Sequence, residues 1–334
     1  MQKLKVSYSN QTVDVFIENH LIDHIQDYLN QEEHYFIITD QIVASKYLDS
    51  IIKQIDHYDL FILSSGELSK NFDDVKKIIT HLMAANIQKK DYLLALGGGV
   101  VGDITAFVAS IYKRGVKFIA IPTTLTSQVD SCLGGKCGVD FTFNNDTYKN
   151  QIGTFYHPEK ILVDPFLLTS LPKTEFASGM SEVIKYGLCF SSTLLNKIKN
   201  DAPIEEVIFD CLQIKAKITE QDEFDQNKRL ALNYGHTIGH ALESLSQFSI
   251  NHGQAVALGL YYETKQPSIR EVLRTIYQKF SINLAFSFHI KDIIKFIEKD
   301  KKRNHAMITV PILKEIGVVA VETIAFEEYC RGME

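Results

Sequence analysis

A stripe of polar side chains around position 235 has the composition of a binding site. It consists of Arg229, Asn233, His236 and His240. Their spacings of four, three and four residues would put them on one face of a helix. A guanidinium, an amide and two imidazoles suit an anion or a metal ion, and a solvated surface stripe is the alternative. Gly235 and Gly239 each cost about 1 kcal/mol relative to alanine inside a helix, which indicates that another segment packs closely here.

Two histidines four residues apart are only half of a metal site, so further ligands must come from other segments. No glutamate follows His236, which excludes the His-Glu-x-x-His motif. His252 opens the next predicted helix and is one candidate. Glu182, which shares a helix face with Lys185, is another, although spacing alone does not distinguish it from other acids. Three nitrogen and oxygen ligands with one open position are typical of a catalytic zinc site.

A glycine-rich turn joins a predicted strand at 92–96 to a helix. The spacing Gly97-x-Gly99-x-x-Gly102 is that of dinucleotide-binding turns, where glycines let a pyrophosphate approach a helix N-terminus. A tight turn without a ligand explains the pattern equally well. The acid that a Rossmann domain carries on the next strand is missing. Asp40, after an earlier strand, and the segment Gly66-Glu67-x-x-Lys70 are the candidates instead, and Asp40 is also explained as a helix N-cap.

The elements that must position these residues change character along the chain. Strands are predicted at 3–8, 13–17, 35–39, 60–63, 92–96 and 118–121, alternating with helices at 21–29, 41–57, 72–85 and 103–112. This alternation predicts a mostly parallel sheet covered on both faces. Helical patterns follow at 173–199, 203–221, 228–247, 252–264, 267–280 and 290–299, and strand signals return at 307–311 and 317–321. We expect an α/β domain over 1–160, a mainly α-helical domain over 161–334, and a small-molecule site between them.

Composition excludes several classes of protein. With 45% hydrophobic and 23% charged residues the chain is neither disordered nor a coiled coil, and a net charge of −6 argues against bulk binding to nucleic acid. The five cysteines are scattered, which excludes a disulfide framework and a zinc ribbon. The apolar run 92–112 contains Asp103 and three consecutive glycines, so a membrane span is not expected. The first ten residues lack the apolar core of a signal peptide. We expect a cytoplasmic protein without nucleic-acid or membrane partners.

Six segments occur in an order that resembles the 3-dehydroquinate synthase family of sugar phosphate cyclases. They are GGGVVGD, IPTTLTSQVDSCLGGKCGVD, KNQIGTFYHP, SGMSEVIKYG, RLALNYGHTIGHA and NHGQAVALG. The resemblance runs from about residue 35 to 302. It implies an N-terminal α/β NAD-binding domain, a helical metal-binding domain, NAD⁺, zinc or cobalt, and a homodimer. It also implies a lyase of the shikimate pathway, which leads to chorismate and the aromatic amino acids. This lyase converts 3-deoxy-arabino-heptulosonate 7-phosphate to 3-dehydroquinate and phosphate by transient oxidation, phosphate elimination, re-reduction and aldol closure.

The resemblance also implies a role for individual residues. The implied metal ligands are Glu182, His236 and His252. The implied NAD contacts are Asp40, Glu67, Lys70, Gly98, Gly99, Val100, Asp103, Thr123, Thr124, Lys136, Lys149, Ser170 and Leu171. The implied substrate contacts are Asp130, Lys136, Asn150, Lys185, Lys215, Arg229, Asn233 and His240, with Arg114 reaching the phosphate from a partner subunit and Lys301 or Lys302 closing over the substrate. His240 is a candidate for proton transfer at ring opening, or alternatively for orienting Glu182 or a water.

Departures from the family pattern keep other functions open. The run 141–149 is longer than the usual short turn, Gln254 stands where glutamate is usual, and the stretch 252–300 is shorter. The alternatives are a sister cyclase with another sugar phosphate, a metal-dependent polyol dehydrogenase that releases NADH, and a binding protein without turnover. Arg229 and Asn233 favour a substrate that carries a carboxylate.

Overall fold

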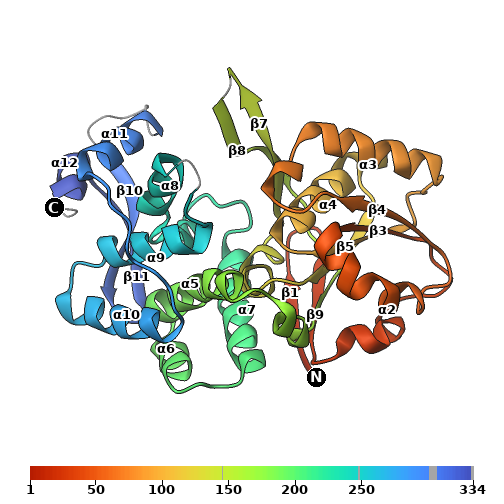
Figure 1. Ribbon diagram of the computed structural model, residues 1–334, viewed down its shortest axis with the longest axis horizontal. Helices are drawn as coiled ribbons and strands as arrows, with labels where there is room; N and C mark the ends of the chain where they lie inside the picture. Colours follow the sequence, from red (N-terminus) through yellow and green to blue (C-terminus); the bar gives the residue numbers. More distant parts are fainter. Residues whose placement is uncertain (145, 247–248, 301–306, 332–334) are drawn as a thin grey trace. The chain divides into compact units, whose positions relative to one another are not determined.

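The computed structural model describes residues 1–144, 146–246, 249–300 and 307–331 (Figure 1). The chain divides into two compact units, Met1–Leu171 and Pro172–Glu334. The boundary lies later than the position expected near 160. The reason is that strand β9 (Lys160–Val163) pairs with β2 and β6 and so belongs to the sheet of the first unit.

The first unit is built on a seven-stranded sheet in the order β1-β2-β9-β6-β5-β3-β4. The β1–β2 pair is antiparallel and the other pairs are parallel. The six strands predicted from the sequence are all present, as β1 (Gln2–Ser7), β2 (Thr12–Ile17), β3 (Tyr35–Asp40), β4 (Tyr58–Leu63), β5 (Tyr92–Gly97) and β6 (Lys117–Pro122). Every residue of β5 is buried, as expected for a central parallel strand. The carboxyl ends of β3, β5 and β6 therefore share one edge of the sheet.

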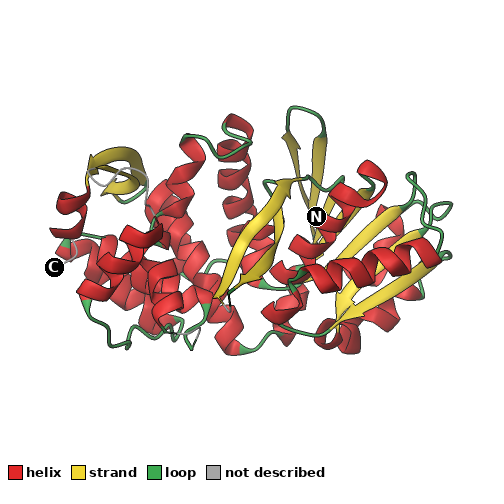
Figure 2. Cartoon of the chain, turned by 90° about the horizontal axis from the view of Figure 1, so that it is seen from above, coloured by secondary structure: helices red, strands yellow, loops and turns green. Residues whose placement is uncertain are grey.

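Helices of the first unit lie against the sheet (Figure 2). They comprise η1 (Leu21–Tyr28), α1 (Gln41–Val43), η2 (Ala44–Leu48), α2 (Asp49–Ile52), η3 (Glu67–Ser69), α3 (Phe72–Ala84), α4 (Gly99–Ile111), η4 (Tyr112–Arg114), η5 (Ser127–Ser131) and η6 (Pro165–Ser170). The helix expected at 41–57 ends at Ile52, and the one expected at 21–29 is of the 3-10 type. The helix α4 begins at Gly99, directly after β5, so the glycine turn itself forms the helix start.

A β-hairpin occupies the region where an enlarged loop was expected. Strands β7 (Lys136–Phe143) and β8 (Asp146–Phe155) pair antiparallel, with an irregularity between Val139 and Phe141. The run 141–149 thus extends two strands. Its β-branched and aromatic residues favour strand pairing; they are Phe141, Thr142, Phe143, Thr147 and Tyr148. The hairpin contacts α4 and α3 of the same unit.

The second unit is mainly helical, with a two-stranded hairpin before its last described helix. Its helices are α5 (Lys173–Phe190), α6 (Ser192–Lys199), α7 (Ile204–Gln221), η7 (Lys228–Asn233), α8 (His236–Leu245), α9 (His252–Glu263), α10 (Pro267–Lys279), α11 (Ile290–Asp300) and α12 (Phe326–Arg331), and its strands are β10 (Met307–Glu315) and β11 (Val318–Ala325). The helix expected at 173–199 is split at Ser191, whose hydroxyl caps α6 by accepting the Leu194 N–H at 3.1 Å. In the parts of the chain described here, no helix is both long and apolar enough to cross a bilayer.

The expectation of one continuous helix over 228–247 is wrong. A 3-10 helix, η7, ends at Asn233, and α8 begins at His236 after Gly235, whose φ is +82°. A backbone in this left-handed conformation cannot continue a right-handed helix. The polar stripe is therefore divided, with Arg229 and Asn233 on η7, and His236 and His240 on α8.

Candidate metal centre and nucleotide turn

Three potential metal ligands from three helices of the second unit meet at one point. Glu182 lies in the middle of α5, whereas His236 and His252 are the first residues of α8 and α9. Glu182 Oε1 is 3.4 Å from His236 Nε2 and 3.3 Å from His252 Nε2. A ligand atom from each residue lies within 4.8 Å of the others. One ion can therefore contact all three side chains. A carboxylate and two imidazoles are ligands that zinc and cobalt accept.

The second nitrogen of each imidazole has its own partner. His236 Nδ1 lies 3.3 Å from the Tyr234 carbonyl oxygen, and His252 Nδ1 lies 3.4 Å from Glu243 Oε2. Such partners orient an imidazole and select the nitrogen that faces a metal. Glu243 is a residue that sequence analysis missed, and its place three positions after His240 on α8 was the available signal. In a second group, one potential ligand atom each from His240, Glu243 and His252 also lie within 4.8 Å of one another. His252 belongs to both groups.

The charges around Glu182 keep its carboxylate ionised. Glu182 and Lys185 are both buried, and Lys185 Nζ is 2.5 Å from Glu182 Oε2. Burial opposes ionisation of Glu182, but the Lys185 and His236 charges hold its pKa well below the usual range. Burial and the Lys185 charge lower the pKa of His236. Burial acts in the same direction on His252, but its interactions with Glu182 and Glu243 prevail and raise that pKa to about 10. The site thus holds one ionised carboxylate directed at two imidazoles.

His240 stands one helical turn beyond His236. Its ring centroid is 5.4 Å from that of His236 and 6.2 Å from that of His252. Desolvation by the surrounding protein, together with the charges of His236 and His252, lowers the pKa of His240 to about 4. The lowered pKa favours the neutral form of this imidazole, whose residue is exposed in the structure.

Other cationic residues implied as substrate contacts are buried in the same unit. Lys185 on α5 and Lys215 on α7 are 2% and 4% exposed, and these two helices pack together. Arg229 is 3% exposed, and its Nη1 donates to the Glu223 carbonyl at 2.8 Å while its backbone N–H donates to Asp222 at 3.0 Å. Buried cations are uncommon unless they meet anions. Three of the cationic residues implied as substrate contacts are therefore buried in the helical unit.

The glycine turn of the first unit fits a bound pyrophosphate. Gly98 is the N-cap of α4, and a Cβ there would lie 2.9 Å from Thr124 Cγ2. A Cβ on Gly102 would meet no atom within 4 Å, so the approach to this turn is open. Val100 and the other first residues of α4 present backbone N–H groups that have no partner within the helix. Thr123 Oγ1 is buried and, within the described ranges, has no hydrogen-bond partner. An unsatisfied buried hydroxyl beside an open helix N-terminus is consistent with a ligand site.

Asp40 caps α1 in this structure. Its Oδ1 accepts the backbone N–H groups of Ile42 at 2.8 Å and Val43 at 3.1 Å, and also the Ser65 hydroxyl at 2.9 Å. Ser170, another implied NAD position, accepts a hydrogen bond from the Tyr47 hydroxyl at 2.5 Å, and Leu171 follows it at the end of the unit. The hydrogen bonds of Asp40 are those of a helix N-cap, which was one of the two interpretations of this residue.

Lys70 connects an implied NAD contact, Asp103, with an implied substrate contact, Asn150. Lys70 Nζ forms an ion pair with Asp103 and donates to Asn150 Oδ1 at 2.6 Å. Lys70 is 4% exposed. Burial opposes its charge, yet Asp103 and other nearby carboxylates prevail and raise the pKa of Lys70. The group connects η3, α4 and the β7–β8 hairpin, because the Asn150 N–H also donates to Asp140 Oδ1 at 2.9 Å. Glu67 is exposed one turn earlier.

The remaining implied residues are dispersed over the first unit. Asp130 lies in η5, Lys136 begins β7 and is exposed, and Lys149 lies in β8. Arg114 is exposed beyond the C-terminal end of α4. Since the 13 residues of α4 span about 20 Å, Arg114 is far from the glycine turn of its own unit. Lys301 and Lys302 lie outside the described residues.

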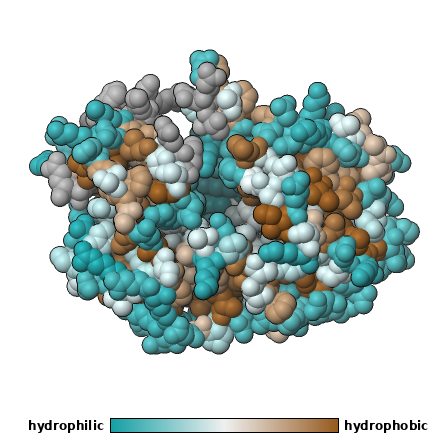
Figure 3. All heavy atoms as spheres, in the orientation of Figure 1, coloured by the Kyte–Doolittle hydropathy of each residue, from teal (hydrophilic) through white to brown (hydrophobic). Residues whose placement is uncertain are grey.

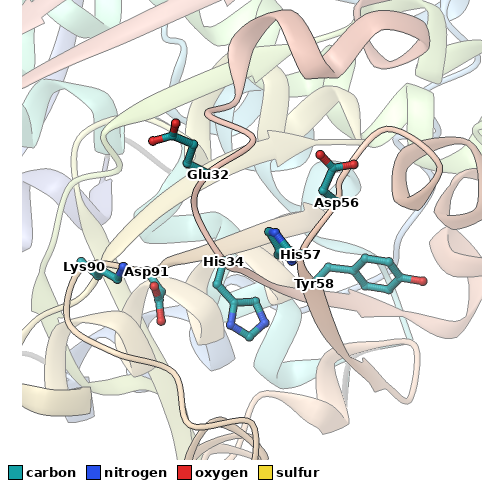
Figure 4. Close-up of a pocket in the computed structure, with 7 residues that line it drawn as sticks. All are labelled: Glu32, His34, Asp56, His57, Tyr58, Lys90 and Asp91. Carbon is teal, nitrogen blue, oxygen red and sulfur yellow. The ribbon is translucent and has the colours of Figure 1, made fainter.

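A separate pocket of about 380 Å³ opens at the amino ends of β3, β4 and β5 (Figure 4). Its lining includes His34, His57 and Asp91. Asp91 accepts the Gln88 N–H at 2.6 Å, and His34 Nε2 lies 2.9 Å from Asp59 Oδ2. These side chains therefore make hydrogen bonds with neighbouring segments of the first unit. Ligands of open parallel sheets bind at the carboxyl ends of the strands, so this pocket is distinct from the glycine turn.

The chain combines a glycine turn in an α/β unit with a carboxylate–imidazole centre in a helical unit. Its fold is that of 2-deoxy-scyllo-inosose synthase and of an iron-containing alcohol dehydrogenase, at 21% and 17% identity. Family models described as 3-dehydroquinate synthase N-terminal and C-terminal match residues 60–178 and 179–303. The chain belongs to the 3-dehydroquinate synthase family. It is therefore an enzyme of the phosphate-eliminating lyase class.

Similar proteins extend over nearly the whole chain. The 3-dehydroquinate synthase of Streptococcus mutans is 35% identical, with 99% of each chain covered. That of Dictyoglomus thermophilum is 34% identical, with 96% of this chain and 94% of the relative covered. Among solved structures, 2-deoxy-scyllo-inosose synthase complexed with carbaglucose-6-phosphate, NAD⁺ and Co²⁺ has a TM-score of 0.88 at 21% identity, with 99% of each chain covered. At that identity the structural likeness shows the fold alone, and the curated relatives favour dehydroquinate synthase over a sister cyclase.

Proposed function

We propose that the protein converts 3-deoxy-arabino-heptulosonate 7-phosphate to 3-dehydroquinate and phosphate. The observation that carries this proposal is the meeting of Glu182, His236 and His252 within 4.8 Å, in a chain that belongs to the dehydroquinate synthase family. Glu182, His236 and His252 would hold a divalent ion, zinc or cobalt, and the turn Gly98–Asp103 would hold NAD⁺. When bound, NAD⁺ would accept the hydride from carbon C5 as the C5 hydroxyl loses its proton, and would later return that hydride to C5, while the ion would lower the pKa of the hydroxyl.

The substrate carries a carboxylate and a phosphate, so the acidic chain needs local cations to bind it. We assign the carboxylate to Arg229, because a guanidinium can donate two parallel hydrogen bonds to it. The Glu223 carbonyl that accepts from Nη1 restrains the plane of this guanidinium. We assign the phosphate to lysines, among them Lys185 and Lys215, whose ammonium groups suit phosphate oxygens.

Proton transfer in this proposal needs few side chains. The leaving phosphate itself takes the proton from the carbon next to C5, which is acidic while C5 is a ketone. His240, one helical turn beyond the candidate ligand His236, accepts the proton of the ring hydroxyl at an imidazole nitrogen when the ring opens. The alternative for His240, that it orients a water or Glu182, predicts a smaller loss of activity on substitution.

We propose a homodimer in the cytoplasm. Large apolar side chains of the first unit are exposed, including Leu68, Phe72, Phe141 and Phe143, and Figure 3 shows apolar groups at the surface of this unit. Such exposure is typical of a subunit interface. The position of Arg114 beyond the far end of α4 supports its action on the phosphate of a partner subunit. Light scattering coupled to size exclusion tests the dimer, and a monomer at micromolar concentration would contradict it.

One assay distinguishes this function from the alternatives. Purified protein is mixed with Co²⁺, catalytic NAD⁺ and the heptulosonate phosphate. We expect release of phosphate without net NADH. The assay is repeated with glucose 6-phosphate and with a polyol in place of the heptulosonate phosphate. Phosphate release from glucose 6-phosphate but not from the heptulosonate phosphate would indicate a sister cyclase, and lasting NADH absorbance with the polyol would indicate a dehydrogenase. Tight NAD⁺ binding without phosphate release from any sugar phosphate would indicate a protein without turnover.

A further inference from the structure

The helix α8, which begins with the candidate ligand His236, starts at a residue that cannot cap it. Its N-cap is Gly235, which has no side chain. The first N–H groups of a helix need acceptors from outside the helix, usually the side chain of a serine, threonine or aspartate at the N-cap. An acceptor for α8 must therefore come from another element.

The neighbouring helix α9 explains why a glycine stands at this position. A Cβ on Gly235 would lie 2.8 Å from Leu260 Cδ2, and a Cβ on Gly259 would lie 1.8 Å from the Gly235 carbonyl oxygen. The two backbones are thus in direct contact. The φ of +82° at Gly235 is also one that residues with a side chain rarely adopt. No ordinary capping residue fits here.

The missing cap comes from Glu263, the last residue of α9. Glu263 Oε2 accepts the Gly235 N–H at 2.9 Å, and Oε1 accepts the Ile238 N–H at 3.3 Å. The two oxygens of one carboxylate therefore bracket His236, one residue before it and two residues after it. A negative charge at this end of α8 is also favoured by the helix dipole.

A second residue orients this carboxylate. The Tyr329 hydroxyl, on α12, donates to Glu263 Oε1 at 3.2 Å. The next residue of the chain acts in parallel, because Thr264 Oγ1 lies 3.0 Å from the Tyr234 hydroxyl. The segment 263–264 thus holds the chain on both sides of His236.

We propose that Glu263 is a positioning residue for the metal centre. From the neighbouring helix α9 it caps the N-terminus of α8 and so fixes the direction of His236, while Tyr329 orients its carboxylate. The inference rests on the metal site of the proposed function. Residues that hydrogen-bond to a metal ligand change metal affinity by about 10- to 100-fold when they are substituted, and we expect an effect of this size from a residue that holds the backbone on both sides of His236.

The test compares variants of the full-length, metal-free protein by titration with Co²⁺, followed by its visible absorption. The variants are Glu263→Ala, Glu263→Gln and Tyr329→Phe. The control is Glu271→Ala on α10. The Glu271 side chain is exposed, and within the described part of the chain its ion pair is with Arg274 of the same helix. Thermal unfolding is measured on each variant without metal.

We expect Glu263→Ala to raise the Kd for Co²⁺ about 10- to 100-fold and to alter the Co²⁺ spectrum. Glu263→Gln should recover most of the affinity, because its amide oxygen still accepts one backbone N–H, and Tyr329→Phe should weaken binding by a smaller factor. The control should match the parent. A Kd for Glu263→Ala within twofold of the parent, or an unchanged spectrum, would overturn the proposal. If Glu263→Ala does not fold, Tyr329→Phe decides: a parental Kd and spectrum in this variant would overturn the proposal.

The same titration separates this inference from the proposed function. A parent protein that binds Co²⁺ but releases no phosphate contradicts the function and leaves the comparison of Glu263 variants valid. A parent protein that binds no Co²⁺ overturns both.

Discussion

Glu182 Oε1 and His252 Nε2 lie 3.3 Å apart, although they come from the interior of α5 and the first residue of α9. This is hydrogen-bond range for a proton shared between a carboxylate and an imidazole. Because His236 approaches the same oxygen, a single ion can replace that proton and bind all three.

Substitution of His236 should remove metal binding and activity together. His236→Ala deletes one of three ligands while the glycine turn of the other unit stays intact. We expect no retained Co²⁺ after desalting, no phosphate release, and NAD⁺ affinity close to that of the parent. Metal analysis, a phosphate assay and a NAD⁺ titration measure these effects. His289→Ala, at an exposed position of the same unit, is the control, and full activity in His236→Ala would refute the ligand assignment.

Arg229→Lys should weaken substrate binding far more than NAD⁺ binding. A lysine keeps the charge but cannot donate two parallel hydrogen bonds to a carboxylate. The expected increase in KM for the heptulosonate phosphate is about 10- to 100-fold, since a hydrogen bond to a charged group is worth about 1.5–3 kcal/mol. Arg274→Lys, on an exposed part of α10, serves as the matched substitution. An equal loss of NAD⁺ and substrate affinity in Arg229→Lys would count against the carboxylate role.

Loss of the Lys70 ammonium should destabilise the first unit. Lys70→Ala leaves Asp103 without its buried counter-ion, and breaking a buried pair costs about 3–5 kcal/mol, less here because Asp103 is 22% exposed. Denaturant unfolding should show a decrease in the free energy of unfolding of about 2–3 kcal/mol, partly restored in the double variant Lys70→Met, Asp103→Asn. Lys77→Ala removes an exposed pair with Asp74 and should have a much smaller effect. Equal effects of Lys70→Ala and Lys77→Ala would contradict the structural role.

The buried thiol of Cys137 should make stability fall in alkaline solution. Burial, and to a smaller degree the Asp103 charge, raise the pKa of Cys137 to about 12. In the unfolded chain the thiol ionises near pH 9, so between about pH 9 and 12 the unfolded state loses a proton that the folded state keeps, and unfolding is favoured. The decrease in Tm between pH 8 and pH 10 should be smaller in Cys137→Ala than in the parent. An identical decrease in both proteins would show that Cys137 does not contribute.

The sequence predicts the parts of this protein that local patterns control. The alternation of apolar runs and helical periods predicts six strands, and the glycines at 97–102 predict a strand–turn–helix. The strand β9 escapes notice because it has four residues and lies between Pro158 and Pro165. The spacing of four polar residues is that of one helix; they are Arg229, Asn233, His236 and His240. The structure has two helices instead, because the chain reverses its backbone conformation at Gly235, where it contacts α9. That contact joins segments distant in sequence, so no local pattern reveals it.

The candidate site was predictable only in part for the same reason. His236 and His240 attract attention by their spacing, but Glu182 is one acid among many until its family segment is considered. Glu243 and Glu263 were missed because their importance lies in which imidazole or helix end they contact, and this depends on the packing of α8 against α9. Local sequence does not encode such pairings.

The central claim is that Glu182, His236 and His252 hold one divalent ion. The most direct test is a crystal structure of the Co²⁺-loaded protein with anomalous data collected at the cobalt absorption edge. We predict one strong anomalous peak about 2.0–2.2 Å from a Glu182 carboxylate oxygen and from Nε2 of both histidines. A peak held instead by His240 and Glu243, or no peak near Glu182, would contradict the claim.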